Sequence, residues 1–182
     1  DLGAHSGVTS YHLARMVGPT GRVIAFEPDT TAFEMLCRNI ELHRLPNVVP
    51  VRRAVAGTSG PRAFNSEGSL GAAFATLVNR RGLAPVTTVE CMSLADACAE
   101  YGVPHFVKMD IEGAELEVVA AAGDVFREHD IRVAADSFHA VDGQPSASRL
   151  ESLFRSFGYT AASGAPYGYL TTWAHRQADT TA

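Results

Sequence analysis

Apolar residues along the chain follow two alternating patterns, which together predict an α/β fold. Short apolar runs, often β-branched, are typical of parallel strands buried on both faces. They predict strands over 23–26, 48–55, 106–109 and 131–135. Apolar residues at helical spacing predict helices over 8–17, 30–45, 94–101, 114–122 and about 146–157. Asp29 or Thr30 can cap the second of these helices. Such alternation is typical of a mostly parallel, doubly wound sheet.

The stretch from Gly57 to Val89 interrupts this alternation. It is rich in glycine, serine, proline and threonine, with short apolar pieces at 72–78 and 86–89. We expect a β-hairpin insertion with loops here, because these turn-forming residues end strands and helices alike. Residues 167–175 predict a closing strand. A single domain would then occupy residues 1–176, followed by a polar tail at 177–182.

The composition is that of a globular protein with a packed core. Hydrophobic residues make up 46% of the 182 residues and charged residues 19%, which is too apolar for a disordered chain. The net charge of -5, without a basic run, argues against nucleic acid as the main partner. No long apolar stretch or signal-like segment argues for a membrane. Cys37, Cys91 and Cys98 lack the spacing of a disulfide framework or zinc site, which favours a cytoplasmic protein with reduced thiols.

A glycine-containing loop, Asp1-Leu-Gly-Ala-His-Ser-Gly7, carries the first candidate site. Gly3 and Gly7 allow a tight turn and a close approach of the backbone to a ligand. The helix that follows presents free N–H groups, which suit a small carboxylate such as the methionine end of S-adenosylmethionine. Asp1 can pair with the ammonium group of this cofactor, and Glu27 can accept hydrogen bonds from ribose hydroxyls. His5 either contacts the cofactor or the substrate, or simply faces solvent.

A second group of ionisable residues follows the predicted strand over 106–109. Lys108, Asp110 and Glu112 lie where the strand gives way to a helix, and open α/β sheets bind ligands at that edge. Methyl transfer to a hydroxyl needs precise positioning and a base or a metal for the hydroxyl proton, so these residues are catalytic candidates. We interpret Glu115, one turn further, mainly as a complement to the helix macrodipole.

The loop after the next predicted strand offers Asp136 and His139. A neutral imidazole exists at pH 7, so His139 is a candidate general base, although a structural role is about as common. Carboxylates from this edge and from Asp110 could also converge on Mg²⁺, which favours oxygen ligands. The spacing alone assigns no metal ligands.

At these residues the chain resembles the FkbM-type methyltransferase family. The resemblance is carried by the loop over 1–7, by Phe26-Glu-Pro28, by Ala54-Val55 and above all by Val107-Lys-Met-Asp-Ile-Glu-Gly-Ala-Glu115. It implies a Rossmann-like class I methyltransferase that uses S-adenosylmethionine to methylate a hydroxyl of a sugar, polyketide or similar small metabolite. The cofactor contacts that we infer with it are Asp1, Gly3, His5, Gly7, Glu27 and Ala54.

The chain departs from the family pattern at one position after the strand predicted over 131–135. The family tends to carry a glutamate two residues before the histidine, and Ser137 stands there instead, beside Asp136. The departure weakens any transfer of acid–base roles to this edge. The loop motif also ordinarily follows a buried central strand, so we expect that strand to be missing before Asp1. Its absence would leave unpaired strand edges and a poorly stable domain.

Two other functions stay open from the sequence. A nicotinamide-dependent oxidoreductase would prefer Gly-x-Gly-x-x-Gly around a pyrophosphate, whereas Gly3 is followed by Ala4 and His5. A non-catalytic domain that only binds the cofactor would fit the change at Ser137. The acceptor and the oligomeric state leave no recognisable pattern in the chain.

Overall fold

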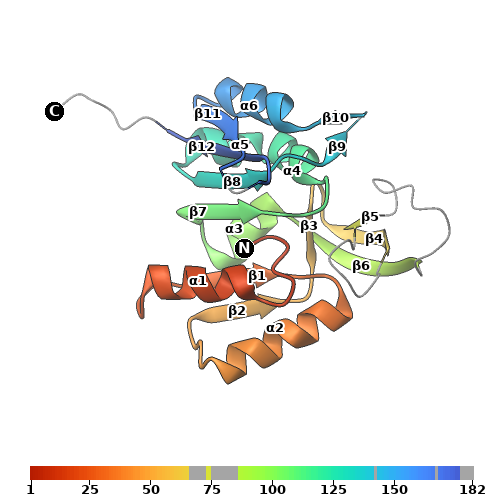
Figure 1. Cartoon of the computed structure of the whole chain (residues 1–182), viewed down its shortest axis with the longest axis vertical. Coiled ribbons are helices and arrows are strands. Elements are labelled where there is room, and N and C mark those ends of the chain that lie inside the picture. The colour runs from red at the N-terminus through yellow and green to blue at the C-terminus, as the bar shows by residue number, and fades with distance from the viewer. Residues whose placement is uncertain (66–72, 75–85, 142, 167, 177–182) are drawn as a thin grey trace. The chain divides into compact units, whose positions relative to one another are not determined.

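The computed structural model describes residues 1–65, 73–74, 86–141, 143–166 and 168–176, and its ribbon is drawn in Figure 1. These residues belong to two compact units. The first unit takes in Asp1–Val55 and Ser59–Met92, and the second takes in Ala56–Thr58 and Ser93–Ala182. No described helix is long and apolar enough to cross a membrane.

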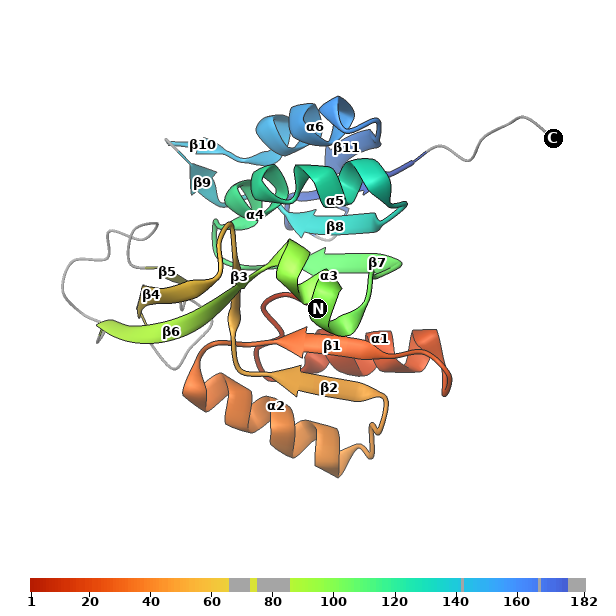
Figure 2. The ribbon, with the colours of Figure 1, turned by 180° about the vertical axis from the view of Figure 1, so that it is seen from behind.

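The first unit is built around a pair of parallel strands. β1 (Val23–Phe26) pairs in register with β2 (Val48–Val51). α1 (Val8–Val17) precedes β1, and α2 (Thr30–Leu42) connects the two strands. Figure 2 shows α2 running alongside β2. Apolar side chains from the loop over 1–7, both helices and both strands form a core of Ala4, Ala14, Val23, Ala25, Leu36 and Val48.

Of the two residues that the sequence offered as the cap of α2, Asp29 is the cap and Thr30 is the first residue of the helix. Asp29 is extended, and its side chain accepts a hydrogen bond from the backbone N–H of Ala32 at 2.9 Å. This bond satisfies one of the N–H groups that have no partner within the helix. The helix ends at Leu42 rather than near Leu45, because the backbone turns at Arg44, whose φ is 52°.

The strand predicted over 48–55 is wrong as one element, because it forms two strands in different sheets. β2 ends at Val51, and β3 (Ala54–Ala56) begins after a tight turn in which Arg53 N donates to Val51 O at 2.9 Å. β3 joins a second sheet of order β3-β6-β4-β5. The other strands of this sheet are β4 (Gly60–Asn65), β5 (Ala73–Phe74) and β6 (Val86–Ser93).

The expected hairpin insertion is present among the described residues of this second sheet. β4 pairs antiparallel with β6 over Gly60–Asn65, and with β5 at Phe64 and Asn65. The predicted apolar piece over 72–78 lies mostly outside the described residues. The piece over 86–89 opens β6, which runs on to Ser93.

The second unit contains a four-stranded mixed sheet of order β11-β12-β8-β7. β7 (Phe106–Met109) and β8 (Arg132–Asp136) are parallel, and β12 (Thr171–His175) pairs antiparallel with β8 and with β11 (Thr160–Gly164). The described helices of this unit are α3 (Leu94–Tyr101), α4 (Glu115–Ala121), α5 (Gly123–Glu128) and α6 (Ala147–Ser156). β9 (Ala140–Val141) pairs antiparallel with β10 (Gln144–Pro145).

An aromatic group fixes the helices of this unit on their sheet. Phe126 and Phe154 are fully buried with their rings 5.3 Å apart, and Phe126 lies 5.9 Å from the Tyr159 ring. The Tyr159 hydroxyl donates to His129 O at 2.7 Å and accepts from Ile131 N at 3.1 Å. These two bonds tie the start of β11 to the segment that leads into β8.

Candidate functional site

The loop over 1–7 folds over the end of β1. Leu2 forms a parallel bridge with Phe26, and the N–H groups of Gly3 and Ala4 both donate to Phe26 O, at 3.0 and 2.9 Å. Gly3 and Gly7 have φ values of 78° and 89°, in the region that favours glycine. A Cβ on Gly7 would also lie 2.7 Å from Leu36 Cδ1. Both glycines therefore occupy positions where a side chain is disfavoured.

Glu27 connects this loop to the end of β1. Its side chain is buried, Oε2 accepts from His5 N at 2.7 Å, and Oε1 accepts from Asp29 N at 2.8 Å. His5 has a φ of 47°, which is uncommon for a residue other than glycine, and this conformation accompanies its bond to Glu27.

Asp1 is held by a residue that sequence reasoning missed. Ser10, fully buried in α1, donates its hydroxyl to Asp1 Oδ2 at 2.6 Å. A serine three residues beyond a glycine loop has no distinctive spacing, so only the fold reveals this contact. Ala54 is buried in β3. Its inferred contact with the cofactor stays a prediction.

The second candidate site brings together side chains from two segments of the second unit. Lys108 and Asp110 lie at the end of β7, and His139 follows β8. Between Asp110 and α4, the backbone turns at Glu112 and Gly113, whose φ values are 55° and 101°. Glu112 Oε2 then lies 3.4 Å from His139 Nε2.

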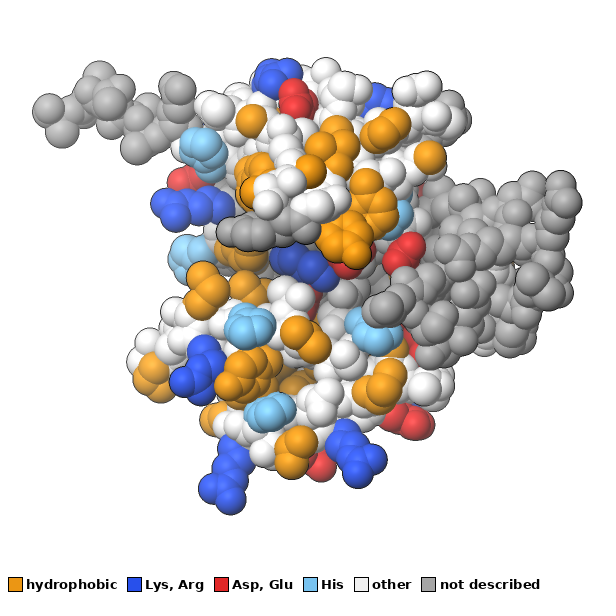
Figure 3. All heavy atoms as spheres, viewed as in Figure 1, with side chains coloured by type: hydrophobic (Ala, Val, Ile, Leu, Met, Phe, Trp, Pro, Cys, Tyr) orange, Lys and Arg blue, Asp and Glu red, His pale blue; other side chains and the backbone are white. Residues whose placement is uncertain are grey.

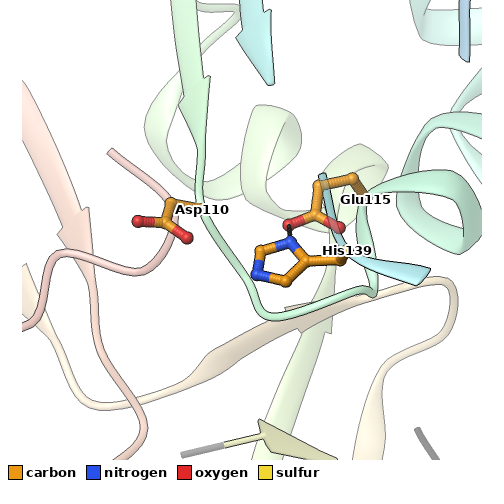
Figure 4. Close-up of side chains that lie close together, drawn as sticks. All are labelled: Asp110, Glu115 and His139. Atoms are coloured by element: carbon orange, nitrogen blue, oxygen red, sulfur yellow. Dashed lines mark ion pairs between the residues drawn. The ribbon is translucent and has the colours of Figure 1, made fainter. Parts of the chain in front are cut away.

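Glu115 contacts the other ring nitrogen of the same histidine. Its Oε1 lies 3.3 Å from His139 Nδ1 and also accepts from Ile111 N at 2.9 Å. Figure 4 shows the carboxylate facing the imidazole ring. The Glu115 side chain has no exposed surface. Our interpretation of this residue as mainly a helix-dipole complement was incomplete, because a residue with that role alone would normally face solvent. The available signal was helical spacing, because Glu115 lies three and four positions before Val118 and Val119, which are also buried.

The two glutamates determine the electrostatics of His139. Burial lowers the pKa of the imidazole, but contacts with Glu112 and Glu115 outweigh burial and raise it to about 10. In this arrangement the ring carries a proton at neutral pH, which differs from the neutral base considered from the sequence. His139 as it stands therefore supplies a positive charge between two carboxylates.

The pKa of the Asp110 carboxyl depends mainly on the burial of this residue. Burial raises the pKa of its carboxyl to about 6, against the opposing charge of Lys108, whose Nζ lies 3.9 Å from Asp110 Oδ2. Burial likewise raises the pKa of Asp136, while Lys108 and a hydrogen bond from Thr171 lower it. The predicted residues Lys108, Asp110, Glu112 and His139 are thus neighbours within one unit.

Ser137 has a structural role. It is fully buried, and its hydroxyl and its backbone N–H both donate to Leu170 O, at 3.1 and 2.8 Å. These bonds secure the segment before β12 to the end of β8. Ser137, which replaces the glutamate of the family pattern, therefore bonds to Leu170. The carboxylates that contact His139 are those of Glu112 and Glu115.

Exposed aromatic rings adjoin His139. The Phe138 ring lies 4.1 Å from the imidazole and 5.6 Å from the Tyr169 ring, and the two aromatic residues are 41% and 68% exposed. Exposed rings beside polar groups are typical of ligand-binding surfaces. In Figure 3, hydrophobic side chains and histidines are interspersed with charged side chains on the face that is drawn.

Comparison with known proteins places this fold among the methyltransferases. The family model for the methyltransferase FkbM domain matches residues 1–161. The chain therefore belongs to the FkbM methyltransferase family. It is 33% identical over 120 residues to the hexuronic acid methyltransferase AglP of Haloferax volcanii, a match that covers 65% of this chain and 47% of AglP. This chain thus spans about half the length of that relative.

Two solved structures share the fold. Methyltransferase FkbM from Methylobacillus flagellatus KT aligns with a TM-score of 0.63 and 19% identity, over 96% of this chain and 42% of that one. Precorrin-6y C5,15-methyltransferase from Geobacter metallireducens GS-15 aligns with a TM-score of 0.59 and 13% identity, over 97% of this chain and 79% of that one. The predicted Rossmann-like α/β fold is confirmed.

Proposed function

We propose that this protein is an S-adenosylmethionine-dependent methyltransferase that methylates a hydroxyl of a sugar, polyketide or similar small metabolite. Family membership supports methyl transfer, and AglP is named as a hexuronic acid methyltransferase. The observation that carries the proposal is the bonding of the loop over 1–7 to Phe26 and Glu27. We further propose that residues 1–176 act as one methyltransferase domain, because the family match spans residues of both units.

The first unit would bind the cofactor. α1 begins at Val8 and has no side-chain cap at Gly7, so the N–H groups of its first turn would be available to the methionine carboxylate. Asp1, oriented by Ser10, would receive the ammonium group, and Glu27 would accept from the ribose hydroxyls. The absence of a Cβ at Gly3 would leave the backbone open to close approach, while His5 and Ala54 would line the cofactor.

The second unit would hold the acceptor. The hydroxyl oxygen of the acceptor would attack the methyl carbon of the sulfonium, the S–CH₃ bond would break as the O–CH₃ bond forms, and S-adenosylhomocysteine would leave. The hydroxyl proton would pass to the carboxylate of Asp110 or Glu112. Asp110 and Glu112 would accept a hydrogen bond from that hydroxyl, while Lys108 and His139 would orient the carboxylates. Positioning of this kind is the main requirement of an in-line transfer. Phe138 and Tyr169 would pack against the apolar face of the acceptor.

A methyl-transfer assay tests this proposal. The purified protein is incubated with S-adenosylmethionine and a panel of hexuronic acids, neutral sugars and polyketide alcohols, and products are examined by mass spectrometry for one added methyl group. We expect a methyl ether with at least one acceptor, and a large loss of rate in Glu112→Gln but not in the exposed control Glu34→Gln. Cofactor binding without methyl transfer to any acceptor would favour the non-catalytic alternative.

A further inference from the structure

We propose that Asp110, Glu115 and His139 bind one divalent transition-metal ion, such as Mn²⁺ or Zn²⁺. Each residue offers a ligand atom, and these three atoms lie within 4.8 Å of one another. The ion would displace one proton of the His139 imidazolium into solvent, because only a deprotonated ring nitrogen ligates a metal. The ligands come from the end of β7, the start of α4 and the loop after β8, and Figure 4 shows the Glu115 carboxylate and the His139 ring pointing toward each other. Residues distant in the sequence thus converge on a small volume.

The hydrogen bonding of the buried atoms points to a missing ligand. Glu115 Oε2 is buried and has no hydrogen-bond partner among the described residues, and the same holds for both ring nitrogens of His139. The contacts of 3.3 and 3.4 Å between His139 and the two glutamates exceed the roughly 2.7–2.9 Å of a charge-assisted hydrogen bond. An unsatisfied buried carboxylate oxygen is costly, and a bound cation would satisfy it.

The donor set indicates which class of ion fits. One imidazole nitrogen with two carboxylate oxygens suits Mn²⁺, Fe²⁺ or Zn²⁺, whereas Mg²⁺ prefers oxygen ligands alone. Metal–ligand bonds of about 2.0–2.2 Å place neighbouring ligand atoms roughly 3 Å apart. The three ligand atoms lie within 4.8 Å of one another, so they would need to approach by at most about 2 Å to reach that spacing. Glu112 lies beside the proposed metal site, 3.4 Å from His139 Nε2, and adds a negative charge without being one of the three ligands.

Three protein ligands leave coordination positions for water or an acceptor oxygen. A metal-bound hydroxyl loses its proton more readily, because the cation stabilises the alkoxide. This role in methyl transfer rests on the proposed function. Binding of the ion does not, since it depends only on residues of the second unit.

Metal binding is measured directly on the purified protein after removal of metals by a chelator. Titration with Mn²⁺, followed by calorimetry and by loss of the free-ion electron paramagnetic resonance signal, should show one ion per chain. The bound ion should show a nitrogen coupling from His139 that disappears in His139→Asn. Asp110→Asn and Glu115→Gln should each weaken binding at least about tenfold, whereas the exposed control Glu128→Gln should bind like the original protein.

The outcomes separate this proposal from the proposed function. Because Glu115 is buried, each variant is first checked for cooperative melting, and the less buried Asp110 carries the test if Glu115→Gln fails to fold. No binding of Mn²⁺ or Zn²⁺, or binding unchanged in Asp110→Asn and His139→Asn, overturns the metal site. That result would leave His139 as a protonated residue held between Glu112 and Glu115. Failure to bind S-adenosylhomocysteine would instead count against the methyltransferase.

Discussion

Substitution of Gly7 by alanine should destabilise the protein through two separate effects. The first is conformational, because Gly7 has a φ of 89° and ψ of 15°, and a left-handed backbone costs an L-residue with a Cβ roughly 1–2 kcal/mol. The second is steric, because the new Cβ would lie 2.7 Å from Leu36 Cδ1. Leu36 is fully buried, so relief of this contact requires a core side chain to repack, and overpacking typically costs about 1–3 kcal/mol.

The sum predicts a loss of about 2–5 kcal/mol in the free energy of unfolding for Gly7→Ala. Gly158→Ala is the matched control. Gly158 also has a positive φ, of 86°, in a helix C-terminal turn where Tyr159 N donates to Phe154 O, yet a Cβ there meets nothing within 4 Å. It should lose only about 1–2 kcal/mol. Both values are measured by urea denaturation followed by circular dichroism. Equal losses in the two variants would refute the proposed close contact with Leu36.

Three further substitutions test other contacts. Asp29→Ala removes the cap of α2 and should cost about 1 kcal/mol by the same denaturation assay; an unchanged midpoint would contradict the cap. Tyr159→Phe leaves His129 O and Ile131 N without their hydroxyl partner and should cost about 1–3 kcal/mol, whereas a neutral effect would show that water replaces the hydroxyl. Phe138→Ala should leave the melting temperature nearly unchanged, since the ring is 41% exposed, but raise the KM for the acceptor several-fold; an unchanged KM would remove Phe138 from the acceptor surface.

Several elements could be placed from sequence because their boundaries carry local signals. The helix over 8–17 lies between Gly7 and Gly18, and both glycines adopt positive φ. The strand over 23–26 ends before Pro28, which has no N–H to donate to a sheet. The helix over 94–101 begins at Ser93, whose hydroxyl accepts from Asp96 N at 3.0 Å. Local chemistry determines each of these boundaries.

Elements that depend on distant partners were placed less well. The apolar run over 48–55 appears continuous, yet Val51 pairs with Phe26 while Ala54 belongs to another sheet. Strand β11 was not predicted, because the residues of Thr160–Gly164 have small, weakly apolar side chains. This strand is stabilised by its pairing with β12, which lies elsewhere in the sequence. The helix predicted over 114–122 is followed by a further helix, α5, whose Phe126 is fixed by aromatic packing. Strand pairing and aromatic packing of this kind depend on residues that are distant in the sequence, so local patterns do not indicate them.

The candidate site, too, could be predicted from the sequence only in part. The residue types at 108–112 and 139 indicated a site at the ends of neighbouring strands, and the structure brings them together. The inward position of Glu115 and the contact of Ser10 with Asp1 depend on how α4 and α1 are rotated about their axes. From a sequence, the rotation of a helix can be inferred only from the apolar residues that form its buried face. The tail over 177–182 lies outside the described residues, so its prediction stays untested.

Calorimetry with S-adenosylhomocysteine tests the central claim most directly. We predict binding of one molecule per chain, with the affinity of Glu34→Gln unchanged and that of Glu27→Gln at least about tenfold lower, because a hydrogen bond to a charged group is worth about 1.5–3 kcal/mol. Circular dichroism must show that each variant is folded, since Glu27 also bonds to His5 N. Absence of binding by the folded protein, or equal affinities in Glu27→Gln and Glu34→Gln, would contradict the assignment of this loop as the cofactor site.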